Sequence, residues 1–254
     1  MKKITAALLA LTSILMSCDK ENKTLEGTHT GPEVPMGNGK AFSWIKTDKE
    51  GKPVSIGFTL TTTALDGLPD HADEHAHNST ELVLPKRSSN TVFDHIVIDW
   101  NPEGHPPAPI YAAPHFDFHM YMMTSSERKA IPAYESDSSG FLQFPGADYL
   151  PSGYFNPGGG APQMGAHWID PTSPELNGQP FTETFIYGSY KGSVNFLEPM
   201  VSYEFLKSTD EFSRTIPRPA KVKTSGYYPT IFRIKKTANG WDCIFEGMEW
   251  RAGS

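Results

Sequence analysis

The strongest constraint on the fold is a series of short strand-like segments that fills the chain from about residue 41 onward. Each segment alternates apolar and polar residues or is rich in β-branched residues, and turn-forming residues separate it from the next. This pattern predicts a mainly β fold: an antiparallel β-sandwich or barrel with long Pro/Gly-rich loops and one or two short helices. The predicted strands are 55–63, 80–84, 95–100, 115–123, 181–189, 193–199, 230–235 and 241–247, and the predicted helices are 125–130 and 202–206.

The N-terminus has the order of residues that export requires. Met1-Lys2-Lys3 is followed by an uncharged, mostly apolar stretch that ends at Met16. This stretch is shorter than the roughly 20 apolar residues of a transmembrane helix. Leu15-Met16-Ser17-Cys18 resembles the lipobox of bacterial lipoproteins, in which the cysteine is acylated and becomes the new N-terminus. An ordinary signal peptide that contains a cysteine is the alternative.

These features divide the chain into three parts. We expect a lipoprotein signal peptide at 1–17, a flexible tether at 18–40 and a single β-rich domain at 41–254. Acyl chains, palmitate among them, would anchor Cys18 to a membrane without the chain crossing it. Asp19-Lys20-Glu21 looks like an acidic sorting signal, so we expect a cell-envelope location at the outer membrane or cell surface rather than at the inner membrane.

The net charge limits which partners the protein is expected to bind, and the number of cysteines limits how its fold can be stabilised. The formal net charge is −7, and removal of Lys2 and Lys3 with the signal peptide lowers it to −9. An acidic domain without a basic tract argues against nucleic acid as a partner. After lipidation of Cys18 only Cys243 remains, so no intramolecular disulfide can form. Stability must come from a core or a metal.

The segment from His115 to Met123 carries the clearest chemical signal, because it alternates strictly between apolar and polar residues. Alternation on a strand sends one set to the core and the other to the opposite face. The opposite face would carry a row of residues whose side chains can bind metal ions. The two sets are Phe116, Phe118, Met120 and Met122, and His115, Asp117, His119 and Tyr121.

We predict a divalent transition-metal site formed by His115, His119 and His167, with Asp117 and His105 as accessory groups. The metal would be zinc, with iron or manganese as alternatives. Residues four apart on a strand are about 13 Å apart at Cα, so two imidazoles reach one ion only with difficulty. Either the strand bends at His115, or Asp117 binds or orients between the histidines.

Simpler interpretations stand beside this one. The polar face can be the solvent side of a half-covered sheet. Glu183 and Glu198, each on a predicted strand, could be ligands or acids, but one exposed glutamate per strand is also what a half-solvated sheet shows. A dense His/acidic cluster at 70–77 is interpreted as a solvated loop, since nothing hydrophobic shapes a site there. Two Pro/Gly-rich connections, 101–114 and 145–180, are long enough to be functional loops.

Several blocks of sequence carry a wider resemblance over roughly residues 50–250. They are Asp99 to Pro107, Pro114-His115-Phe116-Asp117-Phe118-His119, Gly165-Ala166-His167-Trp168, and the later blocks 185–190 and 198–200. This set resembles a family of uncharacterised bacterial exported proteins with a domain of unknown function. The resemblance implies an association with envelope-stress regulation in one branch of that family. It also raises the possibility that the protein assembles into a homo-oligomeric ring.

The sequence thus predicts an exported lipoprotein with a metal site whose reaction is not specified, and it leaves enzymatic activity undecided. The alternative is a non-enzymatic ligand-binding or assembly module of the cell envelope. Its small-molecule ligand is unidentified. Aromatic residues around the glycine-rich loop would line such a pocket: Tyr149, Tyr154, Phe155 and Trp168.

Overall fold

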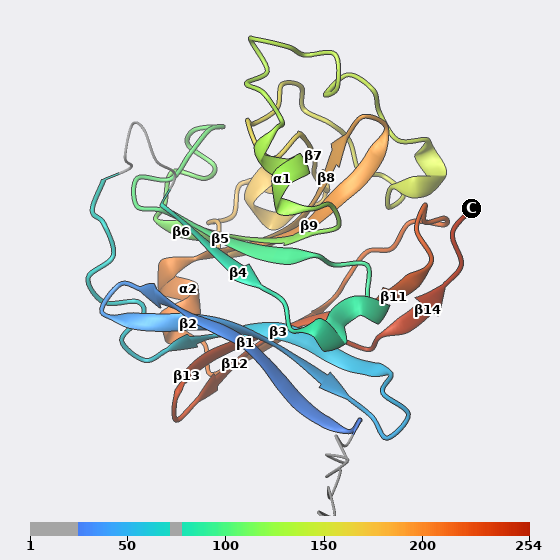
Figure 1. The fold of residues 1–254 in the computed structure, drawn as a ribbon. Helices are drawn as coiled ribbons and strands as arrows, with labels where there is room; N and C mark the ends of the chain where they lie inside the picture. Colours follow the sequence, from blue (N-terminus) through green and yellow to red (C-terminus); the bar gives the residue numbers. More distant parts are fainter. Residues whose placement is uncertain (1–24, 72–77) are drawn as a thin grey trace, which may run out of the picture.

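The computed structural model describes residues 25–71 and 78–254. Two six-stranded antiparallel sheets lie face to face as a sandwich, which confirms the predicted fold class (Figure 1). In these described ranges no helix is long and apolar enough to cross a bilayer. The predicted signal peptide and Cys18 lie outside the described residues.

The first sheet joins strands from both ends of the described chain. Its order is β1-β2-β3-β13-β12-β10, so β3 pairs directly with β13. Its strands are β1 (Gly27–Met36), β2 (Gly39–Thr47), β3 (Pro53–Thr61), β13 (Gly240–Glu246), β12 (Ile231–Thr237) and β10 (Glu211–Thr215).

The second sheet has the order β4-β5-β6-β9-β8-β7, and a two-stranded sheet of β11 and β14 lies apart. Two short helices, α1 and α2, follow β6 and β9. The bounds are β4 (Ser79–Val83), β5 (His95–Asn101), β6 (His115–Tyr121), β9 (Ser193–Ser202), β8 (Glu183–Tyr190), β7 (Ala166–Trp168), β11 (Gly226–Tyr228), β14 (Glu249–Arg251), α1 (Ser125–Lys129) and α2 (Tyr203–Ser208).

The main core lies between the two six-stranded sheets. Phe116, Phe118 and Met120 of β6 are fully buried in it, as the alternation predicts. The ring of Phe118 meets that of Phe58 on β3 edge-on, with centroids 4.9 Å apart. The other face of β6 is therefore turned away from this core.

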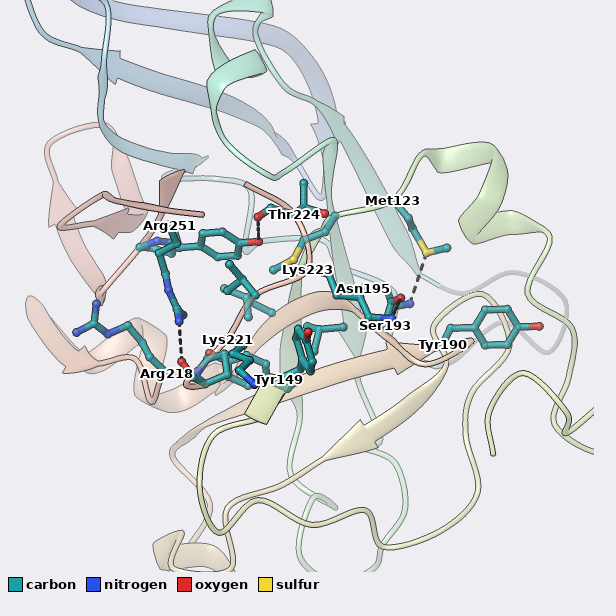
Figure 2. A pocket seen from close by; sticks show the side chains of 18 of the residues that line it. Met123, Tyr149, Tyr190, Ser193, Asn195, Arg218, Lys221, Lys223, Thr224 and Arg251 are labelled. Carbon is teal, nitrogen blue, oxygen red and sulfur yellow. Dashed lines mark hydrogen bonds between the residues drawn. The ribbon is translucent and has the colours of Figure 1, made fainter. Parts of the chain in front are cut away.

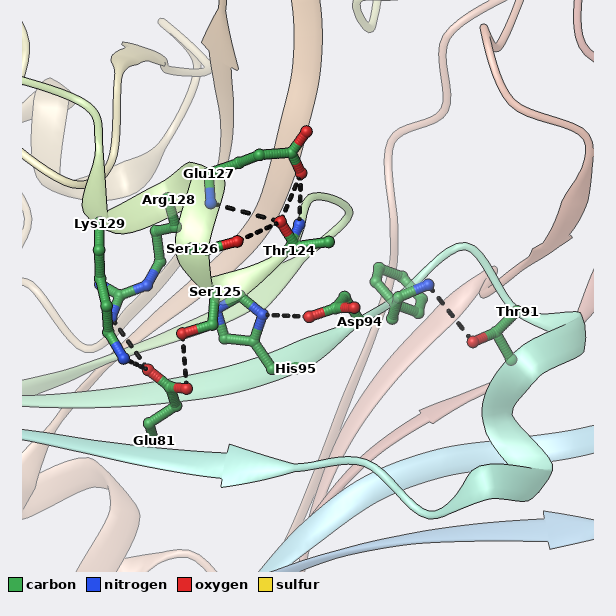
Figure 3. A network of polar contacts seen from close by, with 11 residues as sticks. Glu81, Thr91, Asp94, His95, Thr124, Ser125, Ser126, Glu127, Arg128 and Lys129 are labelled. Carbon is green, nitrogen blue, oxygen red and sulfur yellow. Dashed lines mark hydrogen bonds and ion pairs between the residues drawn. The ribbon is translucent and has the colours of Figure 1, made fainter.

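Helix α1 fixes the chain that leaves β6. Thr124 and Glu127 form a reciprocal capping box, so Thr124, and not Ser125, caps the helix. Ser125 instead donates a hydrogen bond of 2.7 Å to Glu81 on β4, and Arg128 forms an ion pair with Glu81 at 3.1 Å (Figure 3). These contacts hold α1 against the outer edge of the second sheet.

The expected tether at 18–40 is wrong for its second half, because Gly27–Met36 forms β1 and Gly39 begins β2. The ordered β domain thus includes at least 14 residues before residue 41. β1 is an edge strand whose side chains are mostly exposed or part-exposed, so its sequence is as polar as that of a linker. Its order comes from hydrogen bonds to β2, which composition does not reveal.

Candidate functional site

The outer face of the second sheet carries a buried layer of polar side chains. Alternation places Asp99 of β5, Asp117 and His119 of β6, and Glu198 of β9 on this face, opposite the core. All four are at most 5% exposed. The face is therefore not the solvent side of the sheet: residues of the two predicted Pro/Gly-rich loops, such as Pro107 and Gly160, lie over it.

Three side chains from three strands form the first cluster, which we call the His119 group: His119, His167 and Glu198. Their ligand atoms lie within 4.8 Å of one another. Glu198 Oε1 is 3.4 Å from His119 Nε2, and Glu198 Oε2 is 3.8 Å from His167 Nε2. On its other side, His119 Nδ1 lies 2.9 Å from Asp99 Oδ2.

Strand register explains why these residues meet. The β6–β9 pairs Asp117↔Met200 and Met120↔Leu197 bracket His119 and place it opposite Glu198. On the far side, β7 places His167 next to Gly188 of β8.

The space at Gly188 is filled by a neighbouring aromatic ring. A Cβ on Gly188 would lie 2.0 Å from the ring of Phe196, which is fully buried. The imidazole of His167 packs on the same ring, with centroids 5.5 Å apart. Glycine at this position therefore lets Phe196 support His167 beside Glu198.

The second cluster, which we call the His115 group, consists of His105, His115 and Asp117. Nε2 of His105 and Nε2 of His115 each lie 3.3 Å from an oxygen of Asp117. Nδ1 of His115 is 2.7 Å from the carbonyl oxygen of Ala113, and Nδ1 of His105 is 2.7 Å from that of Pro106. Nδ1 therefore carries the proton in both rings, and Nε2 faces the carboxylate.

Many of these buried atoms have no hydrogen-bond partner among the described residues. They include His115 Nε2, Asp117 Oδ1, His119 Nε2 and Glu198 Oε2. Buried polar atoms are nearly always paired in native proteins, so a concentration of unpaired ones points to a missing ion or water. Here all of them are metal-ligand atoms.

Burial and mutual charge also shift the protonation of the site. Burial raises the pKa of Glu198 well above its usual range. Burial, with the nearby charge of His119, lowers the pKa of His167 to about 4, so His167 is a neutral imidazole at pH 7. Burial alone would raise the pKa of Asp117, but the adjacent imidazoles of His105 and His115 outweigh it and hold that pKa well below the usual range.

A cavity of about 610 Å³ lies against both groups. His105 and Asp117 of one group and His167 and Glu198 of the other line it, whereas His115 and His119 are not among its lining residues. This volume is in the range of small-molecule sites. Both groups can therefore meet a molecule that enters the cavity.

Comparison with known proteins gives one match. A model described as "TTHB210-like: Hypothetical protein TTHB210" matches residues 48–100. The match is to an uncharacterised family. No curated protein and no solved structure matches the chain.

The TTHB210-like segment contains β3 and β4 and ends in β5, just after Asp99. It covers the first strand of the polar layer but none of the six side chains of the two groups. The resemblance noted in the sequence is supported over this segment, about a fifth of the chain. The histidine motifs lie beyond it.

The structure divides the ligand set predicted from the sequence. His119 and His167 meet in one group, whereas His115 lies in the other with His105 and Asp117. The pairing of β6 with β5 runs without a bulge from His115 to Tyr121, so His115 and His119 stay separated by the spacing of residues along a strand. His105 and Asp117 were expected as accessory groups, but their ligand atoms lie in the same cluster as that of His115.

Sequence reasoning discounted Glu198 and assigned Asp99 no role. Glu198 was interpreted as an exposed residue of a half-solvated strand, but it is 2% exposed. Its signal is present in the sequence, since it is a single acid within the apolar run from Phe196 to Val201. Such an acid needs a partner when it is buried.

Other predicted positions lie away from this site. Of the 70–77 cluster, residues 72–77 lie outside the described residues, and His71 is 84% exposed beside Glu103. None of the four aromatic residues proposed to line a pocket lines the cavity over the two groups. Trp168 packs against the main core and lines a separate cavity together with Tyr154, and Tyr149 lines another one.

Proposed function

We propose that this protein binds divalent transition-metal ions, one in the His119 group and one in the His115 group. The observation that carries the proposal is the convergence of buried, unpaired imidazole nitrogens and carboxylate oxygens in both groups. Each group offers two histidines and one carboxylate. This donor set suits zinc, ferrous iron and manganese.

Neighbouring residues would orient the ligands. Asp99 faces Nδ1 of His119, the Ala113 carbonyl accepts from His115, and Asn101 donates a 2.8 Å hydrogen bond to Asp117. Such outer contacts fix the ring tautomer and direction of metal-binding histidines. They favour metal sites in which the ligand side chains are already oriented before the ion binds.

The cavity supports a catalytic rather than a purely structural use of the metal. Three protein ligands leave coordination positions free, and a bound ion supplies Lewis acidity and an activated water. His167 and Glu198 would face the substrate, and residues of the proline- and glycine-rich loops line the same cavity. We therefore propose metal-dependent chemistry on a small molecule, with hydrolysis or oxygen chemistry as the two classes to screen.

Metal stoichiometry tests the proposal. Protein stripped with a chelator and reloaded with Zn²⁺ should retain about two equivalents. His105→Ala and His167→Ala should each remove about one equivalent, and the double variant should remove both. His105 and His167 are the more exposed histidine of each group, so the sheet should stay folded by circular dichroism.

His71→Ala is the matched control, since His71 is exposed and outside both groups; it should keep both ions. Retention of all zinc by the double variant would refute the ligand assignment. Absence of zinc, iron and manganese from the folded wild-type protein would favour the non-enzymatic binding-module alternative.

We also propose that the protein is anchored to the cell envelope by lipid on Cys18. The lipobox-like sequence supports this, and eight residues then separate Cys18 from β1. Eight residues reach at most about 30 Å, which would keep the domain near the membrane surface. Cys18→Ser should move the protein from the membrane fraction to the soluble exported fraction, measured by fractionation and immunoblotting; continued membrane association would contradict the anchor.

A further inference from the structure

A second cavity, of about 330 Å³, shares no lining residue with the one over the metal groups. Figure 2 shows side chains that line it from the start of β9, from the segment 218–224 and from Arg251 on β14, together with Met123, Tyr149 and Tyr190. Its volume is at the small end of the range of ligand sites.

All charged side chains that line this cavity are positively charged. Five of the lining residues are cationic, and none of those described is acidic, although the whole chain has a net charge of −7. A concave, one-signed lining concentrates the field and attracts counter-ions. The five cations are Lys191, Arg218, Lys221, Lys223 and Arg251.

Three of these cations, Lys191, Lys223 and Arg251, have no carboxylate partner among the described residues. Lys223 Nζ donates to the Gly192 carbonyl at 2.6 Å and to Ser193 Oγ at 2.9 Å. Arg251 donates to two backbone carbonyls, at 2.9 and 2.8 Å. These neutral acceptors hold the side chains in place but do not cancel their charge. Arg218 and Lys221, by contrast, form exposed ion pairs with Glu249 and Asp148.

The rest of the lining is apolar and aromatic. Leu197 and Val222 are buried at 2% and 6% exposure. The hydroxyl of Tyr187 donates to the Pro217 carbonyl at 2.6 Å, and that of Tyr228 to the Thr224 carbonyl at 2.7 Å. Because both hydroxyls are already paired with backbone, the two tyrosines offer ring surface to an occupant.

We propose that this cavity binds a small aromatic carboxylate, with the ring against Tyr187 and Leu197 and the carboxylate at Lys223 and Arg251. A buried apolar floor favours the ring, and charge-assisted hydrogen bonds to Lys223 and Arg251 favour the anion. The site is independent of the proposed metal centre, since no residue is shared.

Isothermal titration with 2-naphthoate and with its neutral amide tests the proposal. The carboxylate should bind saturably with one site and a Kd below about 1 mM, and the amide should bind at least about tenfold more weakly. Lys223→Gln should weaken naphthoate binding by about tenfold or more. Lys223 is exposed at the rim, so this variant should fold normally.

Lys235→Gln provides the matched control, because Lys235 is an exposed lysine on β12 and lies outside the cavity. It should leave the Kd unchanged. The His105→Ala/His167→Ala double variant should also bind naphthoate normally, which separates this site from the metal centre. Equal affinity for acid and amide, no effect of Lys223→Gln, or no saturable binding would each overturn the proposal.

Discussion

Phe118→Ala is expected to lower the free energy of unfolding by about 3–5 kcal/mol. The ring is fully buried at the centre of the sandwich, where it contacts Phe58 of the opposite sheet and stacks on Phe116 at 5.7 Å between centroids. Truncation removes contacts with both sheets and leaves a cavity that the flanking strands cannot close. Urea denaturation followed by circular dichroism measures the change.

Leu142→Ala is the control for this measurement. Leu142 is also a large apolar residue, but it is 56% exposed. Its truncation should change stability by no more than about 0.5 kcal/mol. If Phe118→Ala costs no more than Leu142→Ala, the two sheets do not share the core described here.

Asp99→Asn is expected to weaken one of the two proposed metal sites by about 10–100-fold while leaving all its ligands in place. Asp99 lies 2.9 Å from Nδ1 of His119 and accepts a hydrogen bond from Ser79. Asparagine keeps the shape but loses the charge that orients the imidazole and raises its basicity. Competition with a chelator of known zinc affinity measures the loss.

The same titration contains an internal reference, since the His115 group does not use Asp99 and should keep its affinity. Asp242→Asn serves as the external control, because that carboxylate accepts its hydrogen bond from Thr59 in the other sheet. Unchanged affinity of both sites in Asp99→Asn would show that the Asp99 contact does not orient a ligand.

The local sequence pattern was sufficient to predict the central strands of the sheets. It was insufficient to predict the short or exposed strands. The predicted strand at 95–100 corresponds to β5, because it combines β-branched residues with clear boundaries. β1 and β14 have largely part-exposed or exposed side chains, and β11 and β14 have only three residues each. Such elements are set by their hydrogen-bonded neighbours, which lie far away in sequence.

At the candidate site, too, the local sequence pattern predicted some features, whereas others depend on contacts between residues far apart in the sequence. Alternation along β6 identified the face that carries His115, Asp117 and His119, and the structure confirms that they share it. It could not show that Glu198 lies beside His119, because that depends on β6 pairing with β9. Nor could it show that the 101–114 connection brings His105 to Asp117.

The pairing of β3 with β13 constrains the order in which this molecule can fold. Thr59 and Asp242, which join these strands by a hydrogen bond, are 183 residues apart in sequence. Until the last part of the chain is available, β3 is an open edge that can pair with strands of other molecules. Long-range strand pairing of this kind is slow and leaves aggregation-prone species exposed. Truncation before β12 should therefore give aggregates rather than a smaller folded unit.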